Sequence, residues 1–179
     1  MGAIMQITLE DFKDDTPWDS KVEQLQPVVV PDAIADMRLL RLDRHGDKRG
    51  HLTVLMSELR EPAEKLVHVY QVMAEARSVR AWVYHKRQWD RLAFNTGDFR
   101  VVLYDLRPGS ATYGKLNVLD VGDAAPSLLF IPPFIIHGVQ NKSDAPATFV
   151  NMPTRAYDPA FPDKSRLPAN HPGIPYQFA

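Results

Sequence analysis

The stretch RAWVYHKRQWDRLAFNTGDFRVVLYDL, residues 80–106, contains three runs that are rich in β-branched and aromatic residues. The runs cover 80–84, 90–94 and 99–106, and the turn-forming sequence NTGD separates the last two. Runs this short, bounded by turn signals and lacking a helical period, are typical of antiparallel strands. The stretch therefore predicts an all-β fold.

Similar runs recur on both sides of this stretch, from residue 37 to about residue 151. Such close spacing favours an antiparallel sandwich or barrel over a helical or α/β fold. We expect residues 37–179 to form the domain and residues 1–36 to form an N-terminal arm with one short helix at 9–15. The Pro-rich segment from 153 to 179 cannot form a regular helix or a central strand. We expect it to be an ordered strap, docked by its aromatic side chains and Ile174.

Composition excludes several classes of partner. The chain has 179 residues, which suits one domain, and its 21 basic and 22 acidic residues leave a net charge of −1. That balance gives no electrostatic reason to expect nucleic acid or an anionic membrane as a partner. There is no cysteine, so disulfide and thiolate chemistry are excluded. No apolar run approaches the ~20 residues that span a bilayer, and we expect a cytoplasmic protein.

The run at 80–85 concentrates charge in a strand. Because side chains alternate along a strand, Val83 and His85 share one face with residues 79 and 81, while Arg80, Trp82 and Tyr84 share the other. In a small barrel one face lines the interior, where polar groups are costly unless they are paired or bind a ligand. A hydrogen-bonded histidine in a wet barrel mouth is the simpler alternative to a functional His85.

Two spacings resemble the cupin motifs. Val83-x-His85-x4-Asp90-x6-Gly97 is similar to the first motif, and Pro132-x4-His137-x3-Asn141 is similar to the second. The resemblance implies a double-stranded β-helix, or jelly roll. In metal cupins these positions hold the ion, and His85, Asp90 and His137 would remain as two histidines and one carboxylate. We expect no metal, because Val83 replaces one ligand and the acid is one methylene shorter; a metal-dependent cupin enzyme stays an alternative.

A closer resemblance is to the family of dTDP-4-dehydrorhamnose 3,5-epimerase (RmlC). It rests on several pieces in order: Asp47-Lys48-Arg49-Gly50, the strand Arg80 to His85 followed by Gln88, Asp105-Leu106-Arg107, Ser110-Ala111-Thr112-Tyr113-Gly114, Ile131-Pro132-Pro133 with His137-Gly138, and a closing Asn-x-Pro segment. The details of these pieces resemble an atypical branch. The resemblance implies proton abstraction beside the 4-keto group of a nucleotide-linked sugar, without organic cofactor, in a homodimer that exchanges N-terminal strands.

This sequence departs from the family at the catalytic positions. The usual histidine base falls at Val83, which cannot take a proton. The usual tyrosine acid falls at or near Asn151, and the usual aspartate falls at His171. His85 lies on the same face as Val83, about 6.6 Å along the strand, and is the expected base. A non-catalytic cupin that binds a nucleotide sugar is the alternative that Val83 favours.

These considerations assign the candidate residues. We expect His85, Tyr157 and Asp105 to be catalytic, and we expect the following to bind a nucleotide-linked sugar, most simply a dTDP-sugar: Arg49, Arg80, Tyr84, Gln88, Arg91, His137, Asn151 and His171. The arginines match the forked geometry of phosphate oxygens. Two structural alternatives remain open, namely an ion pair between Asp105 and Arg107 and a satisfied core histidine at His137.

Overall fold

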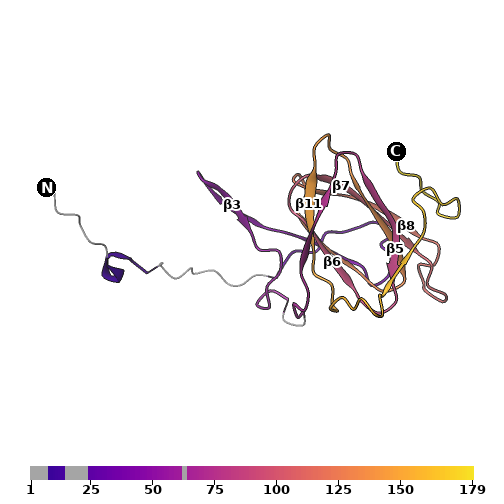
Figure 1. Ribbon diagram of the computed structural model, residues 1–179, viewed down its shortest axis with the longest axis horizontal. Helices are drawn as coiled ribbons and strands as arrows, with labels where there is room; N and C mark the ends of the chain where they lie inside the picture. The colour runs from indigo at the N-terminus through magenta and orange to yellow at the C-terminus, as the bar shows by residue number, and fades with distance from the viewer. Residues whose placement is uncertain (1–7, 15–23, 62–63) are drawn as a thin grey trace.

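The computed structural model describes residues 8–14, 24–61 and 64–179, and the fold is an antiparallel β-sandwich (Figure 1). One five-stranded sheet has the order β1-β9-β6-β11-β4, with the strands β1 Arg38–Arg41, β9 Ser127–Ile131, β6 Asp90–Phe94, β11 Ala147–Asn151 and β4 Tyr70–Ala74. The other has the order β12-β5-β10-β7-β8, with β12 Lys164–Arg166, β5 Val79–His85, β10 Ile135–Asn141, β7 Asp98–Asp105 and β8 Leu116–Gly122. The paired strands of both sheets run antiparallel, which confirms the predicted all-β jelly roll.

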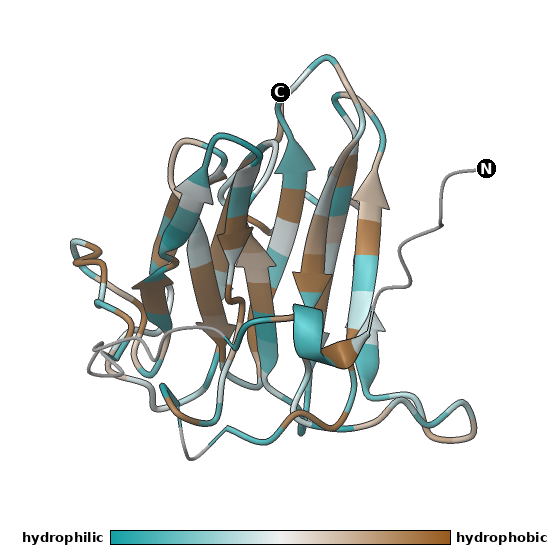
Figure 2. Ribbon diagram, turned by 90° about the vertical axis from the view of Figure 1, so that its left-hand side faces the viewer, coloured by the Kyte–Doolittle hydropathy of each residue, from teal (hydrophilic) through white to brown (hydrophobic). Residues whose placement is uncertain are grey.

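The core lies between the two sheets and follows the alternation of side chains. Apolar residues from facing strands fill it, and the strands in Figure 2 carry hydrophobic bands interrupted by hydrophilic ones. Phe94, Phe99 and Phe149 pack against one another with ring centroids 5.0 to 5.6 Å apart. Phe94 shares the inner face of β6 with Asp90, four residues earlier, so the interior is filled by aromatic rings at one end of this strand and is polar at the other.

The C-terminal segment covers the outer face of β5. Ile174 is buried there, and the rings of Tyr176 and Phe178 lie 6.4 and 4.9 Å from that of Trp82. The indole nitrogen of Trp82 donates a hydrogen bond to the carbonyl of Ala169. The tail therefore docks by its last apolar side chains, while Tyr157 and Phe161, also expected to dock, are exposed.

The described part of the N-terminal region is mixed. Residues 9–11 form a single 3-10 turn, η1 Leu9–Asp11, in place of the expected helix at 9–15, whose last residue lies outside the described ranges. Residues 24–36 pack on the sandwich, where Leu25 and Ile34 are buried. A two-stranded hairpin, β2 Arg44–Asp47 with β3 Gly50–Thr53, projects from the sandwich (Figure 1). Within the described residues, no helix is long and apolar enough to cross a membrane.

Candidate functional site

A cavity of about 340 Å³ opens at the polar end of the sandwich. Strands of both sheets line it, with Asp90 and Leu92 from β6, Val83 from β5 and His137 from β10. A second cavity of about 260 Å³ lies beside it, and the two share Tyr70, Lys164 and Arg166 among their lining residues. The prediction that Val83 and His85 face inward is confirmed. Val83 lines the first cavity, and His85 lines the second.

Three buried side chains converge between the cavities, and we call His85, Asp90 and His137 the floor cluster. The Nε2 atoms of both histidines lie 3.3 Å from the same oxygen, Oδ2 of Asp90. The side chains are 4 to 7% exposed. Each comes from the inner face of a different strand, so the fold assembles the cluster from residues far apart in the chain.

Backbone carbonyls orient both histidine rings. Nδ1 of His85 donates to the carbonyl of Asp163 at 2.7 Å, and Nδ1 of His137 donates to the carbonyl of Ile135 at 3.1 Å. A carbonyl oxygen only accepts, so each ring carries a hydrogen on Nδ1, and each Nε2 faces Asp90. The side chain of Asp163 also accepts hydrogen bonds from the backbone of residues 86–88, which holds the turn after β5 against β12.

Two amides hold the other oxygen of Asp90. Gln88 Nε2 donates to Oδ1 at 2.8 Å, and Asn151 Nδ2 donates to Oδ1 at 3.1 Å. Burial raises the pKa of Asp90, but its interactions with His137 and His85 outweigh this and hold the pKa well below its ordinary value. The carboxylate is therefore an anion with one oxygen left for the histidines. Gln88 and Asn151, both predicted to contact substrate, are held at the site by their hydrogen bonds to this carboxylate.

A bulge in β5 turns Arg80 into the cavity. His137 pairs with Val83, but Val139 pairs with Arg80, so β5 has one more residue than β10 over this interval. A bulge interrupts the alternation of faces, which explains why Arg80 lines the cavity although simple alternation predicts the opposite face. Arg80 is thus placed as expected for a substrate contact, for a reason that the sequence pattern did not contain.

Lys164 and Arg166 of β12 add two more cations to the cavity wall. Burial and the charge of Arg166 lower the pKa of Lys164. Within the described part of the chain, neither they nor Arg80 form an ion pair, whereas most other arginines do. Unpaired cations that line a cavity suit an anionic ligand. Both residues were missed, although PDKSRLP contains them; only the pairing of β12 with β5 brings this tail segment to the site.

Tyr70 is the third residue that the sequence interpretation missed. It lies on β4 opposite Asn151 of β11 in the strand register, and its hydroxyl accepts a hydrogen bond from Asn151 Nδ2 at 2.8 Å. Burial and the negative charge of Asp90 raise the pKa of Tyr70, so its phenol stays protonated at neutral pH. A tyrosine hydroxyl therefore stands beside the position at which the family tyrosine was expected, but on the neighbouring strand.

Arg91, one of the predicted substrate contacts, is fully buried and faces away from the cavity. Its guanidinium donates to Glu64 at 2.9 Å, to the carbonyl of Lys65 at 2.9 Å, and to the carbonyls of Met152 and Pro153. Asp90 already occupies the inner face of β6, so alternation sends its neighbour outward. Arg91 therefore holds the 64–65 and 152–153 segments to the sheet and does not line the cavity where a phosphate contact is expected.

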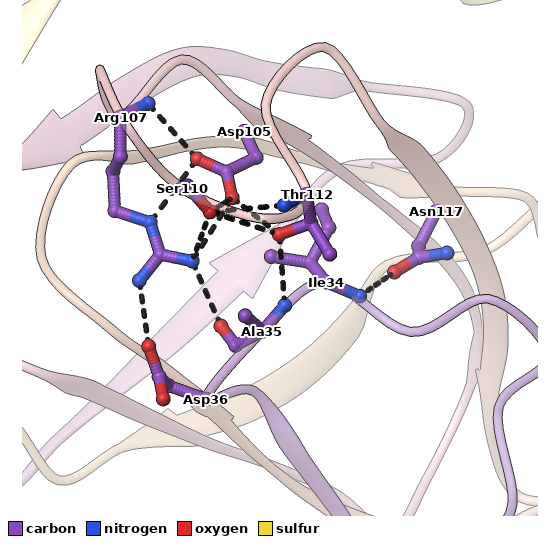
Figure 3. Close-up of polar contacts among 8 residues, drawn as sticks. All are labelled: Ile34, Ala35, Asp36, Asp105, Arg107, Ser110, Thr112 and Asn117. Atoms are coloured by element: carbon purple, nitrogen blue, oxygen red, sulfur yellow. Dashed lines mark hydrogen bonds and ion pairs between the residues drawn. The ribbon is translucent and has the colours of Figure 1, made fainter.

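Asp105 lies in a buried network at the end of β7 (Figure 3). Arg107 pairs with it at 2.9 Å, and Ser110 and Thr112 donate to the same carboxylate. Arg107 also reaches Asp36 and the carbonyl of Ala35, which ties the N-terminal segment to this loop. Asp105 lines neither cavity of the site. The structure therefore supports the ion-pair alternative for Asp105 and does not bring this residue to the floor cluster.

The remaining predicted residues lie outside the first cavity. Tyr84 stacks on Phe134 on the outer face, Arg49 pairs with Asp47 on the exposed hairpin, and His171 accepts a hydrogen bond from the backbone of Gly173 in the C-terminal segment. Tyr157 lines the second cavity and is 66% exposed. Of the predicted set, the structure brings together Arg80, His85, Gln88, His137 and Asn151, with Asp90 at their centre.

The chain resembles known proteins over most of its length. The family model described as dTDP-4-dehydrorhamnose 3,5-epimerase matches residues 31–177. The spore coat polysaccharide biosynthesis protein SpsL of Bacillus subtilis (strain 168) is 34% identical over 139 residues, which are 75% of this chain and 89% of that protein.

Solved structures share the fold. A dTDP sugar isomerase from Desulfovibrio desulfuricans G20 superimposes with a TM-score of 0.78 at 25% identity, covering 84% of this chain and 94% of that one. ChmJ, a 3'-monoepimerase from Streptomyces bikiniensis solved with dTDP-quinovose, has a TM-score of 0.71 at 18% identity, covering 85% and 77%.

Proposed function

The chain belongs to the family of dTDP-4-dehydrorhamnose 3,5-epimerases, and from this premise we propose that it is an isomerase or epimerase of a nucleotide-linked 4-keto sugar. The reaction would move a proton at a carbon beside the keto group. The observation that carries the proposal is the cavity itself, in which unpaired cations line the wall above a buried floor cluster of titratable groups. Enolate chemistry on a diphosphate-linked sugar needs both features.

The positions of the cations suggest where each part of the substrate binds in the cavity. We assign the diphosphate to Arg80, Lys164 and Arg166, because they are the cations that line the cavity without a protein partner among the described residues. The keto sugar is then directed toward the floor cluster. The family name suggests a dTDP-sugar as the substrate class. ChmJ, which shares the fold, was solved with dTDP-quinovose, and this supports the same class.

Proton transfer is assigned to the floor cluster and to Tyr70. His85 is the expected base, and because its Nδ1 donates to the carbonyl of Asp163, Nε2 is the ring atom available for proton transfer. We propose Tyr70 as the acid in preference to Tyr157, because Tyr70 lines both cavities and is hydrogen-bonded to Asn151, which also contacts Asp90. Val83 lines the same cavity and offers no proton-transfer group.

The test of this function is solvent deuterium exchange. The chain is incubated in D₂O with dTDP-4-keto-6-deoxyglucose, and incorporation beside the keto group is followed by NMR. We expect enzyme-dependent incorporation at one or both neighbouring carbons. Tight binding of dTDP without any exchange would favour the non-catalytic, nucleotide-sugar-binding alternative.

Arg80→Ala is expected to weaken binding of dTDP by about 1.5–3 kcal/mol, or roughly 10- to 150-fold, because it removes charged hydrogen bonds to the diphosphate. Calorimetry on the wild type and the variant measures this loss. Arg41→Ala is the matched control, since Arg41 is exposed on β1 and does not line the cavity. Equal affinity in the wild type and Arg80→Ala would place the diphosphate elsewhere.

By the same family premise we propose a homodimer. The hairpin β2–β3 projects from the sandwich and carries Arg49, which lies outside the cavity of its own chain. Arg49 can then meet a substrate only in a second copy of the chain. Light scattering of the purified protein tests the dimer, and a monomer at all concentrations would remove any role for Arg49 in binding.

A further inference from the structure

Asp163 lies where three parts of the site meet. Its backbone carbonyl accepts the hydrogen bond from Nδ1 of His85 at 2.7 Å. It directly precedes β12, whose first residue, Lys164, pairs with His85 in the strand register. Its side chain is 11% exposed and contacts the turn that carries Gln88. Asp163 therefore contacts the proposed base and adjoins one of the cations assigned to the diphosphate.

The carboxylate of Asp163 is held by main-chain donors. Oδ1 accepts the backbone N–H of Lys86 at 3.2 Å, and Oδ2 accepts those of Arg87 and Gln88 at 3.0 and 2.9 Å. Burial raises the pKa of Asp163, but these hydrogen bonds outweigh burial and hold the pKa below its ordinary value. The side chain is therefore an anion that fixes the turn after β5 relative to the start of β12.

Gln88 gives Asp163 a second connection to the floor cluster. The backbone N–H of Gln88 donates to Asp163, and its side-chain amide donates to Oδ1 of Asp90 at 2.8 Å. The other oxygen of Asp90 lies 3.3 Å from Nε2 of His85. Both ring nitrogens of His85 thus depend on contacts that Asp163 fixes, directly at Nδ1 and through Gln88 and Asp90 at Nε2.

The side chain of Asp163 is needed because β12 is a strand of three residues, Lys164–Arg166. The ladder with β5 ends at Lys164, so residue 163 lies at an open end, where backbone groups separate most readily. At the other end, Trp82 and Leu167 exchange two backbone hydrogen bonds. Loss of the carboxylate should therefore loosen the end of β12 beside His85 while the strand itself stays paired.

We infer that Asp163 is a positioning residue, which sets the ring of His85 relative to the cations of β12. The inference rests on the proposed function, in which His85 moves the proton while Lys164 and Arg166 hold the diphosphate. A substrate anchored at these cations presents its reacting carbon at one place, and the base must meet it there. A misplacement of about 1 Å can lower a rate by about 10²-fold. Asp163 acts through His85 and is assigned no proton transfer of its own.

The first test needs no substrate. The Nδ1 proton of His85 is followed by ¹H–¹⁵N NMR of the histidine rings, and its signal is assigned by its absence from His85→Ala. We expect its exchange with solvent to be at least about tenfold faster in Asp163→Ala, because the accepting carbonyl is no longer held against the ring. Asp158→Ala is the matched control and should leave the signal unchanged. Asp158 also accepts two backbone N–H groups in the C-terminal segment, but it lines neither cavity of the site.

The second test is turnover. Asp163→Ala should lower the turnover of deuterium exchange by about 10- to 100-fold. It should leave the affinity for dTDP nearly unchanged, because β12 keeps its pairing with β5. Arg87→Ala removes an exposed guanidinium from Asp163 but keeps the backbone donors, and its turnover should stay close to that of the wild type. If Asp163→Ala does not fold, Asp163→Asn carries the same measurements; it keeps one acceptor oxygen and should show a smaller loss.

Two results would overturn the inference. One is ring exchange that Asp163→Ala leaves unchanged, whatever happens to the melting temperature, which would make the role of Asp163 purely structural. The other is a folded variant that turns over substrate as fast as an active wild type, and this would leave the proposed function standing. Failure of the proposed function looks different. The wild type would then exchange no deuterium, while faster ring exchange in Asp163→Ala would still show that Asp163 positions His85.

Discussion

Replacing His85 with alanine is expected to lower turnover by about 10²–10⁴-fold, the range that a positioned acid–base group contributes. The ring lies in the floor cluster. Its Nε2 faces Oδ2 of Asp90, and its Nδ1 donates a hydrogen bond to the carbonyl of Asp163. Affinity for dTDP should stay nearly unchanged, because the unpaired cations assigned to the diphosphate belong to other residues. Rates of deuterium incorporation and calorimetric affinities for dTDP, measured on the same preparations, separate the two effects.

His171→Ala is the informative comparison. The family pattern places His171 at the catalytic aspartate, whereas the structure places it in the C-terminal segment, where it contacts Gly173. The structure therefore predicts little change for His171→Ala and a large loss for His85→Ala. If the His85→Ala variant incorporates deuterium at the wild-type rate, His85 is not the base. Tyr70→Phe would then be the next variant to measure.

Much of the site could be predicted from alternation along the strands. Val83 and His85 face inward because they are two residues apart, and His137 faces inward between Ile135 and Val139, which belong to the core. Such patterns depend on local backbone geometry, which the sequence determines directly. The two motif spacings added the expectation that Asp90 and His137 meet His85, and the structure confirms that meeting.

Other features depend on pairing between distant segments, and local patterns do not contain it. Arg80 enters the cavity only because β5 has a bulge opposite β10. Tyr70 joins the site through the register of β4 with β11, and Lys164 joins it through the pairing of β12 with β5. Arg91 resembled a ligand-binding arginine because its partners, including Glu64, come from remote loops.

Replacing Asp105 with alanine is expected to lower the free energy of unfolding by about 3–5 kcal/mol, the cost of breaking a buried ion pair by removing one partner. The carboxylate is fully buried and accepts hydrogen bonds from Arg107, Ser110 and Thr112. For a chain of this size the loss corresponds to a melting temperature lower by roughly 6–20 °C. Asp144→Ala, which breaks an exposed pair with Arg77, should leave the melting temperature nearly unchanged.

The loss of unfolding free energy in Asp105→Ala should also depend on pH, in a direction set by the ionisation of the Asp105 carboxyl. Burial raises the pKa of this carboxyl, but hydrogen bonds from Arg107 and Thr112 outweigh burial and bring the pKa well below its ordinary value. A carboxyl with a lowered folded-state pKa adds stability that is fully present above the unfolded-state pKa of about 3.9 and is lost as the pH falls toward the folded-state pKa. The difference between wild type and Asp105→Ala should therefore be largest near neutral pH and shrink below about pH 4. A difference that grows on acidification would contradict a charged Asp105.

Because Arg107 of the same network also holds Asp36 and Ala35, the variant should in addition raise hydrogen exchange at residues 34–36, which a purely local role for Asp105 would not produce.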